Sequence, residues 1–342
     1  MDLHIVWFVL WGVLWAVYFM LDGFVLGAGM LHRVLGRNDS DRRVIINSFG
    51  PVWDGNEVWL ITAGGATFAA FPTTYALMFS YLYTPLLLLL FGLIVRGVSF
   101  EFRSKEDGAA WRGGWDWAIV LSSFIPALLF GVAFGNIFSG LPMDQAGYHG
   151  SLLALLNPYG IVSGLLFVML FAVHGALYVA VKTTGDLSRR AESLAKTLWV
   201  PLLLVAVLFL GYTNFATKLY DNYLKAPVFL VVPLVAVGAL VGVRMLLGAG
   251  NALTAFAASC VTILGVVGTG VIGLFPNLIP SSLDALYSLT IYNSSSSDYT
   301  LKIMTTVAFI FVPIVILYKI WVYRLFRDRV TAEAVAADHE AY

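Results

Sequence analysis

Nine long apolar runs alternate with short polar segments along the 342 residues of this chain. A helix needs roughly 20 residues to cross a hydrocarbon core of about 30 Å, and the runs have about that length. They lie at residues 5–31, 50–71, 76–96, 117–137, 158–181, 198–217, 227–248, 253–276 and 301–323. The pattern therefore predicts an all-α, polytopic membrane protein with nine transmembrane helices, of which the second and sixth are the most polar.

The basic residues divide unequally between the two alternate sets of connections. One set holds only Lys218, Lys225 and Lys302 of the 20 Lys and Arg residues. The other set holds Arg33, Arg37, Arg42, Arg43, Arg96, Arg103, Lys105, Arg112, Lys182, Arg189, Arg190, Lys196, Arg244, Lys319, Arg324, Arg327 and Arg329. Because cytoplasmic loops carry the excess of Lys and Arg, we expect the N-terminus outside and the C-terminus in the cytoplasm. Eight or ten helices would scramble this division.

Composition narrows the class of protein further. Hydrophobic residues make up 60% of the chain and charged residues 12%, so the charged surface of a soluble domain is missing. The net charge is zero and no basic cluster lies outside the loops described above, so we expect no nucleic-acid partner. The single cysteine, Cys260, excludes an intrachain disulfide framework. We expect residues 1–330 to form a single transmembrane domain and residues 331–342 a disordered cytoplasmic tail.

Three carboxylates stand in segments that lipid would disfavour. Asp54 and Glu57 are three residues apart in the second run and so share a helix face. Asp22 in the first run lies at a similar depth from the same membrane face. A charged side chain at the bilayer centre costs about 2.5–3.5 kcal/mol on insertion scales, so these acids are candidates for taking up and releasing protons. Two alternatives stay open, which are that the acids cap a helix start, Asp54 above all, or pair with a hidden arginine.

His174 is the other polar candidate within a predicted span. It could bind a haem iron, but no second histidine stands near it in the sequence. A lone intramembrane histidine more often forms a hydrogen bond to a neighbouring helix. The sequence also lacks a P-loop and any Cys or His cluster with metal-ligand spacing.

Several longer strings resemble subunit II of the cytochrome bd quinol oxidases. The most specific is WDGNEVWLITAGG at 53–65. Others are LDGFVLGAGML at 21–31, WRGGWDWAI at 111–119, GVAFGNIFSGLP at 131–142, LLNPYG at 155–160 and TLKIMT at 300–305. The resemblance runs from the first predicted helix to the last.

The resemblance implies a fold, an activity and a partner. Such a subunit has two four-helix bundles and one peripheral helix, and pairs with a haem-bearing subunit I in the bacterial cytoplasmic membrane. The oxidase oxidises quinol and reduces dioxygen to water, with haem b and haem d in subunit I. Subunit II supports its partner, and in some members it holds a structural quinone or lines an oxygen route, while some complexes add a small accessory subunit.

Carried over by motif, the resemblance places the cytoplasmic proton path on Asp22 and Asp54. Glu57 stands where the family often has glutamine, and Trp59 is a candidate for the oxygen route. The alternative function from another class is a proton-coupled secondary transporter, which would also place acids within Gly-rich helices. A transporter usually shows inverted repeats, and we find none.

Overall fold

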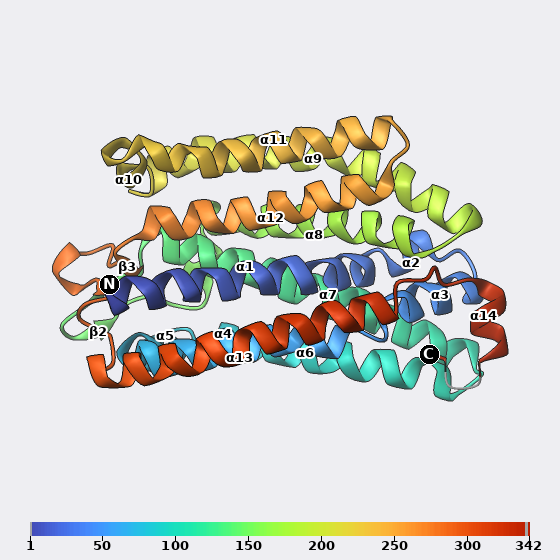
Figure 1. Cartoon of the computed structure of the whole chain (residues 1–342), viewed down its shortest axis with the longest axis horizontal. Coiled ribbons are helices and arrows are strands. Elements are labelled where there is room, and N and C mark those ends of the chain that lie inside the picture. Colours follow the sequence, from blue (N-terminus) through green and yellow to red (C-terminus); the bar gives the residue numbers. More distant parts are fainter. Residues whose placement is uncertain (1, 339–340) are drawn as a thin grey trace.

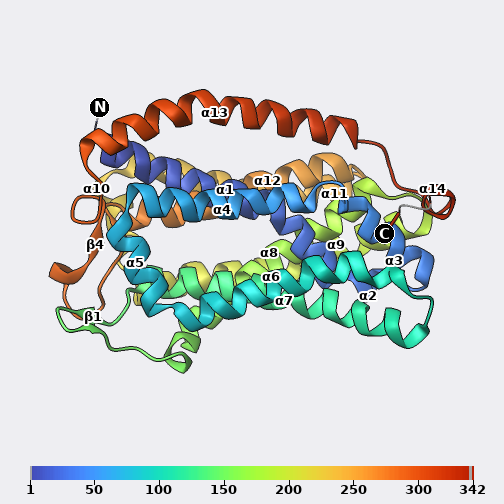
Figure 2. The same ribbon diagram turned by 90° about the horizontal axis from the view of Figure 1, so that it is seen from below.

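The computed structural model describes residues 2–338 and 341–342, and nine α-helices of 18 residues or more run lengthwise through that part of the chain (Figures 1 and 2). They are α1 (Leu3–Met30), α4 (Trp53–Ala70), α6 (Tyr83–Phe102), α7 (Ala109–Ser139), α8 (Pro158–Lys182), α9 (Gly185–Ala216), α11 (Val231–Gly248), α12 (Ala252–Leu274) and α13 (Asp298–Leu325). In the described residues, eight of these helices are long and apolar enough to cross a membrane, and α4 is the exception. The prediction of an all-α, polytopic membrane protein is confirmed, while α4 is too polar to meet the same criterion.

Short elements gather at the two ends of the long helices (Figures 1 and 2). One end carries α2 (His32–Leu35), α3 (Asp39–Phe49), η1 (Arg103–Lys105) and α14 (Ala332–Ala337). The other carries α5 (Pro72–Tyr81), η2 (Leu153–Leu156), α10 (Asp221–Lys225), η3 (Pro227–Leu230), η4 (Ala285–Tyr287) and two antiparallel hairpins. The hairpins pair β1 (Met143–Asp144) with β2 (Gly147–Tyr148), and β3 (Asn277–Ile279) with β4 (Leu289–Thr290). We call the first the basic end and the second the N-terminal end.

The long helices fall into groups by their contacts. Helices α8, α9, α11 and α12 form a closed ring in which each contacts two others. Helices α4 and α6 flank α1 and α7, with contacts from α1 to α4, from α1 to α7 and from α6 to α7. Helix α13 lies along the outside, and none of the residues in its most apolar stretch is buried.

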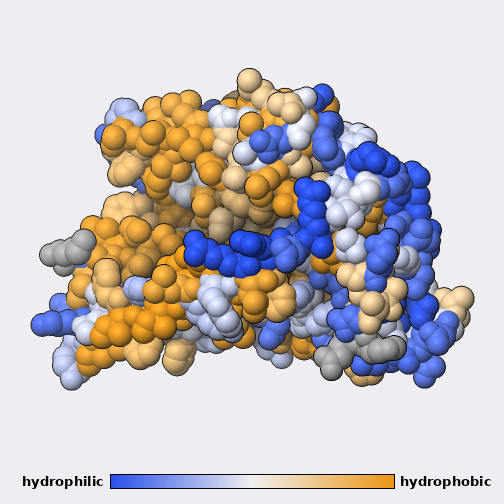
Figure 3. All heavy atoms as spheres, turned by 45° about the vertical axis from the view of Figure 1, so that its right-hand side comes forward, coloured by the Kyte–Doolittle hydropathy of each residue, from blue (hydrophilic) through white to orange (hydrophobic). Residues whose placement is uncertain are grey.

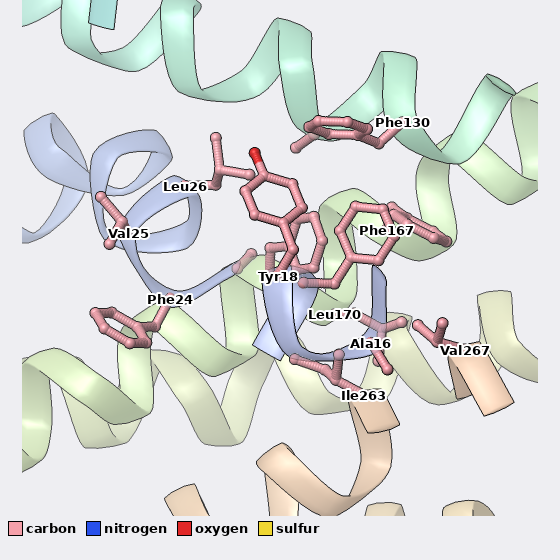
Figure 4. Packing of buried hydrophobic residues seen from close by; sticks show 14 of the residues in the cluster. Ala16, Tyr18, Phe24, Val25, Leu26, Phe130, Phe167, Leu170, Ile263 and Val267 are labelled. Carbon is pink, nitrogen blue, oxygen red and sulfur yellow. The ribbon is translucent and has the colours of Figure 1, made fainter. Parts of the chain in front are cut away.

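Helix α8 lies at the centre because glycines let α1 approach it closely. A Cβ atom on Gly27 would lie 1.8 Å from the main-chain oxygen of Phe171, so no other residue fits there. Gly175 stands opposite on α8, and a Cβ atom on it would lie 2.3 Å from the carbonyl carbon of Gly27. Aromatic side chains fill the space beside this contact, and Figure 4 shows Tyr18, Phe130 and Phe167 among them. One face of α1 is thereby fixed against α8, and Asp22 points toward α6 instead.

The boundaries of the third predicted span are wrong, because a separate helix precedes it. Residues 72–81 form α5 at the N-terminal end, and α6 begins only at Tyr83 rather than near residue 76. The span is therefore displaced along the sequence by about seven residues. Arg96, which the sequence analysis assigned to a connection, consequently lies inside α6 and is fully buried.

The predicted disordered tail also contains structure. Residues 332–337 form α14, which contacts α3, and Val335 in this helix is buried. The preceding strand-like segment is held by a hydrogen bond of 2.7 Å from the Val330 amide to the Lys182 carbonyl. Residues 339 and 340 of the same tail lie outside the described residues.

Polar residues concentrate at the basic end, whereas the flanks of the long helices are largely hydrophobic (Figure 3). This distribution is that of a protein whose middle faces lipid and whose ends face water. The positions of the Lys and Arg residues favour the basic end as the cytoplasmic one.

The orientation can be tested by labelling introduced cysteines in a Cys260→Ser background. Arg189 at the basic end has a side chain that is 76% exposed, and Leu286 at the N-terminal end is 78% exposed. We expect a membrane-impermeant maleimide to label Leu286→Cys in intact cells and Arg189→Cys only after permeabilisation. The reverse pattern would show that the N-terminus faces the cytoplasm.

Candidate functional site

A buried arginine joins two carboxylates from different helices near the basic end. Arg96 on α6 donates from Nη1 to Oδ2 of Asp22 on α1 at 2.9 Å, and from Nη2 to Oε1 of Glu57 on α4. The side chains of Arg96 and Asp22 are fully buried, and that of Glu57 is 17% exposed. We call these three residues the Arg96 cluster. It combines two carboxyl groups with one guanidinium group.

The residues before Glu57 attach the start of α4 to two other helices. Asn56 donates to the Leu21 carbonyl of α1 at 2.8 Å and accepts from the Tyr323 hydroxyl of α13 at 2.9 Å. The Lys319 ammonium of α13 donates to the Gly55 carbonyl. The DGNE segment therefore contacts α1, α6 and α13 within a single helical turn, which explains why it is polar although the helix lies among apolar neighbours.

Asp54 lies apart from the Arg96 cluster. Its side chain is exposed and, among the described residues, it forms no ion pair. Asp54 and Glu57 are three residues apart, which separates their side chains by about 60° around the helix axis. The border between the exposed and the buried face of α4 runs between them. The structure thus brings Asp22 and Glu57 together and leaves Asp54 at the surface. The alternative of pairing with a hidden arginine therefore holds for Asp22 and Glu57. The sequence analysis did not identify Arg96 as that arginine.

Several buried polar atoms around the site have no hydrogen-bond partner within the described part of the chain. They are Oδ1 of Asp22, Nε of Arg96 and the indole Nε1 of Trp59. Tyr18 adds only a long contact of 3.4 Å from its hydroxyl to Oδ2 of Asp22. A buried carboxylate oxygen without a donor can hold a proton or accept a hydrogen bond from water. Trp59 itself is buried on α4, the helix that also carries Glu57.

His174 is fully engaged within the protein. Its Nδ1 lies 2.6 Å from the Ser259 hydroxyl of α12, and its Nε2 lies 2.9 Å from the Met20 carbonyl of α1. Its ring stacks on Phe256 with centroids 4.7 Å apart. The interpretation as a hydrogen-bonding core histidine is confirmed, because neither nitrogen is free to bind iron.

A second ionic cluster at the basic end was not predicted. Asp116 of α7 is fully buried, and it contacts Nε2 of His32 at 2.7 Å, Nη1 of Arg42 at 2.8 Å and Nε of Arg103 at 2.5 Å. Burial lowers the pKa of His32 although the hydrogen bond to Asp116 acts in the opposite direction. Because a carboxylate can only accept, Nε2 of His32 is the donor in its contact with Asp116. The cluster ties α2, α3 and η1 to α7, and in sequence its members look like ordinary loop charges.

Metal ligation finds no support among the described residues. No group of three His, Cys, Asp or Glu side chains there is arranged to hold a metal ion.

Comparison with known proteins places this arrangement in a family. The family model described as "Cytochrome bd terminal oxidase subunit II" matches residues 3–326. The chain belongs to this family. The resemblance inferred from the sequence motifs is confirmed over nearly the whole chain.

Relatives of this cytochrome bd subunit II chain support the same assignment. It is 38% identical over 341 residues to "Cytochrome bd ubiquinol oxidase subunit 2" of Bacillus subtilis, covering 96% of this chain and 97% of the relative. It is 37% identical over 375 residues to "Cytochrome bd-I ubiquinol oxidase subunit 2" of Escherichia coli K12, covering 99% and 98%. A chain in the structure of the bd oxidase from Geobacillus thermodenitrificans has the same fold, with a TM-score of 0.78, 20% identity and coverage of 95% and 99%.

Replacing Arg96 should destabilise the subunit more than replacing an exposed arginine. Arg96→Gln leaves Asp22 and Glu57 buried without their cation, and breaking a buried pair typically costs about 3–5 kcal/mol. We expect a lower midpoint of thermal unfolding for the purified complex, measured against Arg244→Gln, whose side chain is exposed on α11. Adding Asp22→Asn to Arg96→Gln should restore part of the loss because one unpaired charge is removed. Equal midpoints for the two arginine variants would contradict a buried ion pair.

Proposed function

We propose that this chain is the second subunit of a quinol:O2 oxidoreductase, in which it supports a haem-bearing subunit I and takes part in proton uptake from the cytoplasm. The family supports the terminal oxidase role, and the names of the two relatives describe subunits of ubiquinol oxidases. The observation that carries the proton role is the Arg96 cluster, which places two carboxylates opposite one guanidinium inside the protein.

The haems belong in the partner subunit under this proposal. The contacts of His174 support this assignment, because both of its ring nitrogens already lie within hydrogen-bond distance of protein oxygen atoms. We assign haem b and haem d to subunit I. This chain then contributes packing and proton supply, and no electron passes through its side chains.

Charge balance suggests how the Arg96 cluster handles a proton. With Asp22, Glu57 and Arg96 all ionised, the cluster has a net charge of −1. A buried excess charge is costly, and one added proton makes the cluster neutral. Asp54, exposed near the basic end, is placed to receive protons from water, and Glu57 lies one turn further along α4. We propose that Asp54 takes up the proton and that Asp22 passes it toward subunit I, with Glu57 as a secondary proton site beside Asp22.

The charge separation follows from the direction of proton uptake. Protons consumed in oxygen reduction come from the cytoplasmic side, so the reaction is electrogenic without a pump. This proposal includes nine spans, arranged as two four-helix bundles and a peripheral α13, with the N-terminus outside the bacterial cytoplasmic membrane. Surrounding lipid and a small accessory subunit are further partners that the family implies.

Two smaller roles follow from the family rather than from contacts. Trp59 is proposed to line an oxygen route, and its buried indole Nε1 has no acceptor in the described residues. A structural quinone in this chain is also consistent with the family. Within the described residues, we identify no set of hydrogen-bonding groups that would bind its ring. The transporter alternative loses its support with the family match, which covers residues 3–326.

The proton role predicts a kinetic defect without loss of haem. Asp54→Asn and Asp22→Asn keep side-chain size but remove the titrating group, so turnover should fall on the order of 10²-fold, as for other positioned acid–base groups. Quinol-driven oxygen consumption measures the defect, and Asp298→Asn at the N-terminal end, 86% exposed, is the matched control. Asp54→Glu should retain more activity than Asp54→Asn.

Other outcomes of that experiment reassign the residues. For Glu57→Gln we expect a smaller loss, since the family often has glutamine there. A complex that assembles with Asp54→Asn but lacks haem would make this acid a structural cap. Normal turnover in both aspartate variants would place the proton route elsewhere.

The partnership predicts the behaviour of the chain on purification. Large apolar side chains are exposed on α13 and α9, including Phe309 at 69% and Leu204 at 65%, and lipid or a membrane partner must cover them. We expect the chain to purify in a stoichiometric complex with a haem-binding subunit and to hold no haem when expressed alone. Absorption spectra of the two preparations test this, and a stable haemoprotein from the isolated chain would contradict it.

A further inference from the structure

Tyr342 is bound to α3, the helix that precedes the acids of α4. Its amide donates to Oδ1 of Asn47 at 3.1 Å, and the Asn47 side-chain amide donates back to the Tyr342 main-chain oxygen at 3.1 Å. Arg43, one turn earlier on α3, donates from Nε to the same oxygen at 3.0 Å. Three hydrogen bonds therefore hold the main chain of Tyr342 on α3, near the end marked C in Figure 2.

The ring of Tyr342 occupies a space that a glycine leaves open. A Cβ atom on Gly50, at the turn between α3 and α4, would lie 2.7 Å from Cδ2 of this ring. Any other residue at position 50 would therefore displace the ring. The phenol lies beside the first turn of α4, where it interacts with the Trp53 indole and with the charge of Asp54.

The end of α6 packs against the same turn. The centroid of the Phe100 ring lies 4.9 Å from that of Phe49 on α3 and 5.4 Å from that of Trp53 on α4. Gly97, one turn earlier on α6, lets the Trp53 indole approach, because a Cβ atom there would lie 3.0 Å from it. These contacts bring Glu101, the exposed residue after Phe100, to the start of α4.

The Tyr342 phenol interacts with carboxylates from two different helices. Burial raises the pKa of this phenol, and Glu101 on α6 and Asp54 on α4 raise it further, while the Trp53 indole acts in the opposite direction. The hydroxyl group is therefore neutral, and it can donate a hydrogen bond to a carboxylate without adding a charge. It joins α6 to α4 at the surface, as Arg96 does in the interior.

The basic groups near these two carboxylates are bound to main-chain oxygens. Lys319 of α13 donates to the Gly55 carbonyl, and Arg43 donates to that of Tyr342. In the part of the chain that the structure describes, neither carboxylate forms an ion pair, whereas both acids of the Arg96 cluster do. The two surface carboxylates can therefore exchange protons with water.

We propose that Glu101 is a second carboxylate of the proton entry and that Tyr342 is the positioning residue that holds it close to Asp54. A proton from cytoplasmic water binds Glu101 and moves to Asp54, and Glu101 returns to its ionised form. Neighbouring like charges favour binding a proton, and a surface of one sign concentrates the opposite ion. This role rests on the proton uptake proposed above, because it supplies the first acid of that route.

The test measures quinol-driven oxygen consumption by the intact complex at equal haem content. Glu101→Gln should lower kcat about tenfold, at the lower end of the effect that such charges have on ion capture, with an unchanged KM for quinol. Tyr342→Phe keeps the ring but removes the hydroxyl group, so it should lower kcat by a smaller factor. The control is Glu106→Gln, which removes another exposed carboxylate at the basic end and should leave kcat unchanged.

A double variant shows whether the two acids share one route. Because Glu101 acts through Asp54, Glu101→Gln should cause no further loss in an Asp54→Asn background, whereas independent sites would add their effects. Additive losses, or equal kcat for Glu101→Gln and Glu106→Gln, would overturn the role of Glu101. Normal kcat in Tyr342→Phe would make Tyr342 a packing residue only; if that complex fails to assemble, the Glu101 variants decide.

The proposed function can fail independently of this role. A defect in Asp54→Asn together with normal turnover in Glu101→Gln would overturn the second carboxylate and leave the proposed route intact. Normal turnover in Asp54→Asn would overturn the route itself, and with it the transfer from Glu101 to Asp54.

Discussion

The contact of one buried guanidinium with two carboxylates determines how the first helices of this subunit fit together. Helices α4 and α6 both flank the α1 and α7 pair, yet their backbones make no extensive contact with each other. The side chain of Arg96 spans the gap and reaches Glu57 on one side and Asp22 on the other. In a medium without water these charges have no alternative partners, so the relative positions of three helices depend on one side chain.

Hydrophobic patterning predicted most of the helices because lipid permits only helical backbone across its width in a chain of this composition. It did not predict where α6 begins, since the apolar run continues without a polar break from α5 into α6. Pro85 was a signal for the true start of α6. It lies in the first turn of this helix, where proline is tolerated, whereas the predicted span would have placed it in the middle of a helix. A shift of seven residues then placed Arg96 in a loop and hid the partner of both acids.

The location of the site could be predicted from the sequence, but not which of its acids are buried and which is exposed. The spacing of Asp54 and Glu57 identified the polar turn of α4, while the border between its exposed and buried faces depends on how α4 is rotated against α1. Asn56 fixes that rotation, because its side-chain amide donates a hydrogen bond to the Leu21 carbonyl of α1. No local sequence pattern predicts this contact. The cluster around Asp116 was not predicted for a similar reason, since its four members come from four segments that only the folded chain brings together.

The contacts between α13 and the polar turn of α4 set an order for the making of the protein. Gly55 receives its hydrogen bond from Lys319, 264 residues later in the chain, and Asn56 receives one from Tyr323, 267 residues later. At about 5–20 residues per second, a ribosome needs roughly 13–50 s to produce those donors after α4 has been synthesised. During that interval the newly made α4 must satisfy its first turn with water or with the membrane insertion machinery. The peripheral helix therefore completes the turn that contains the acids only at the last stage of synthesis.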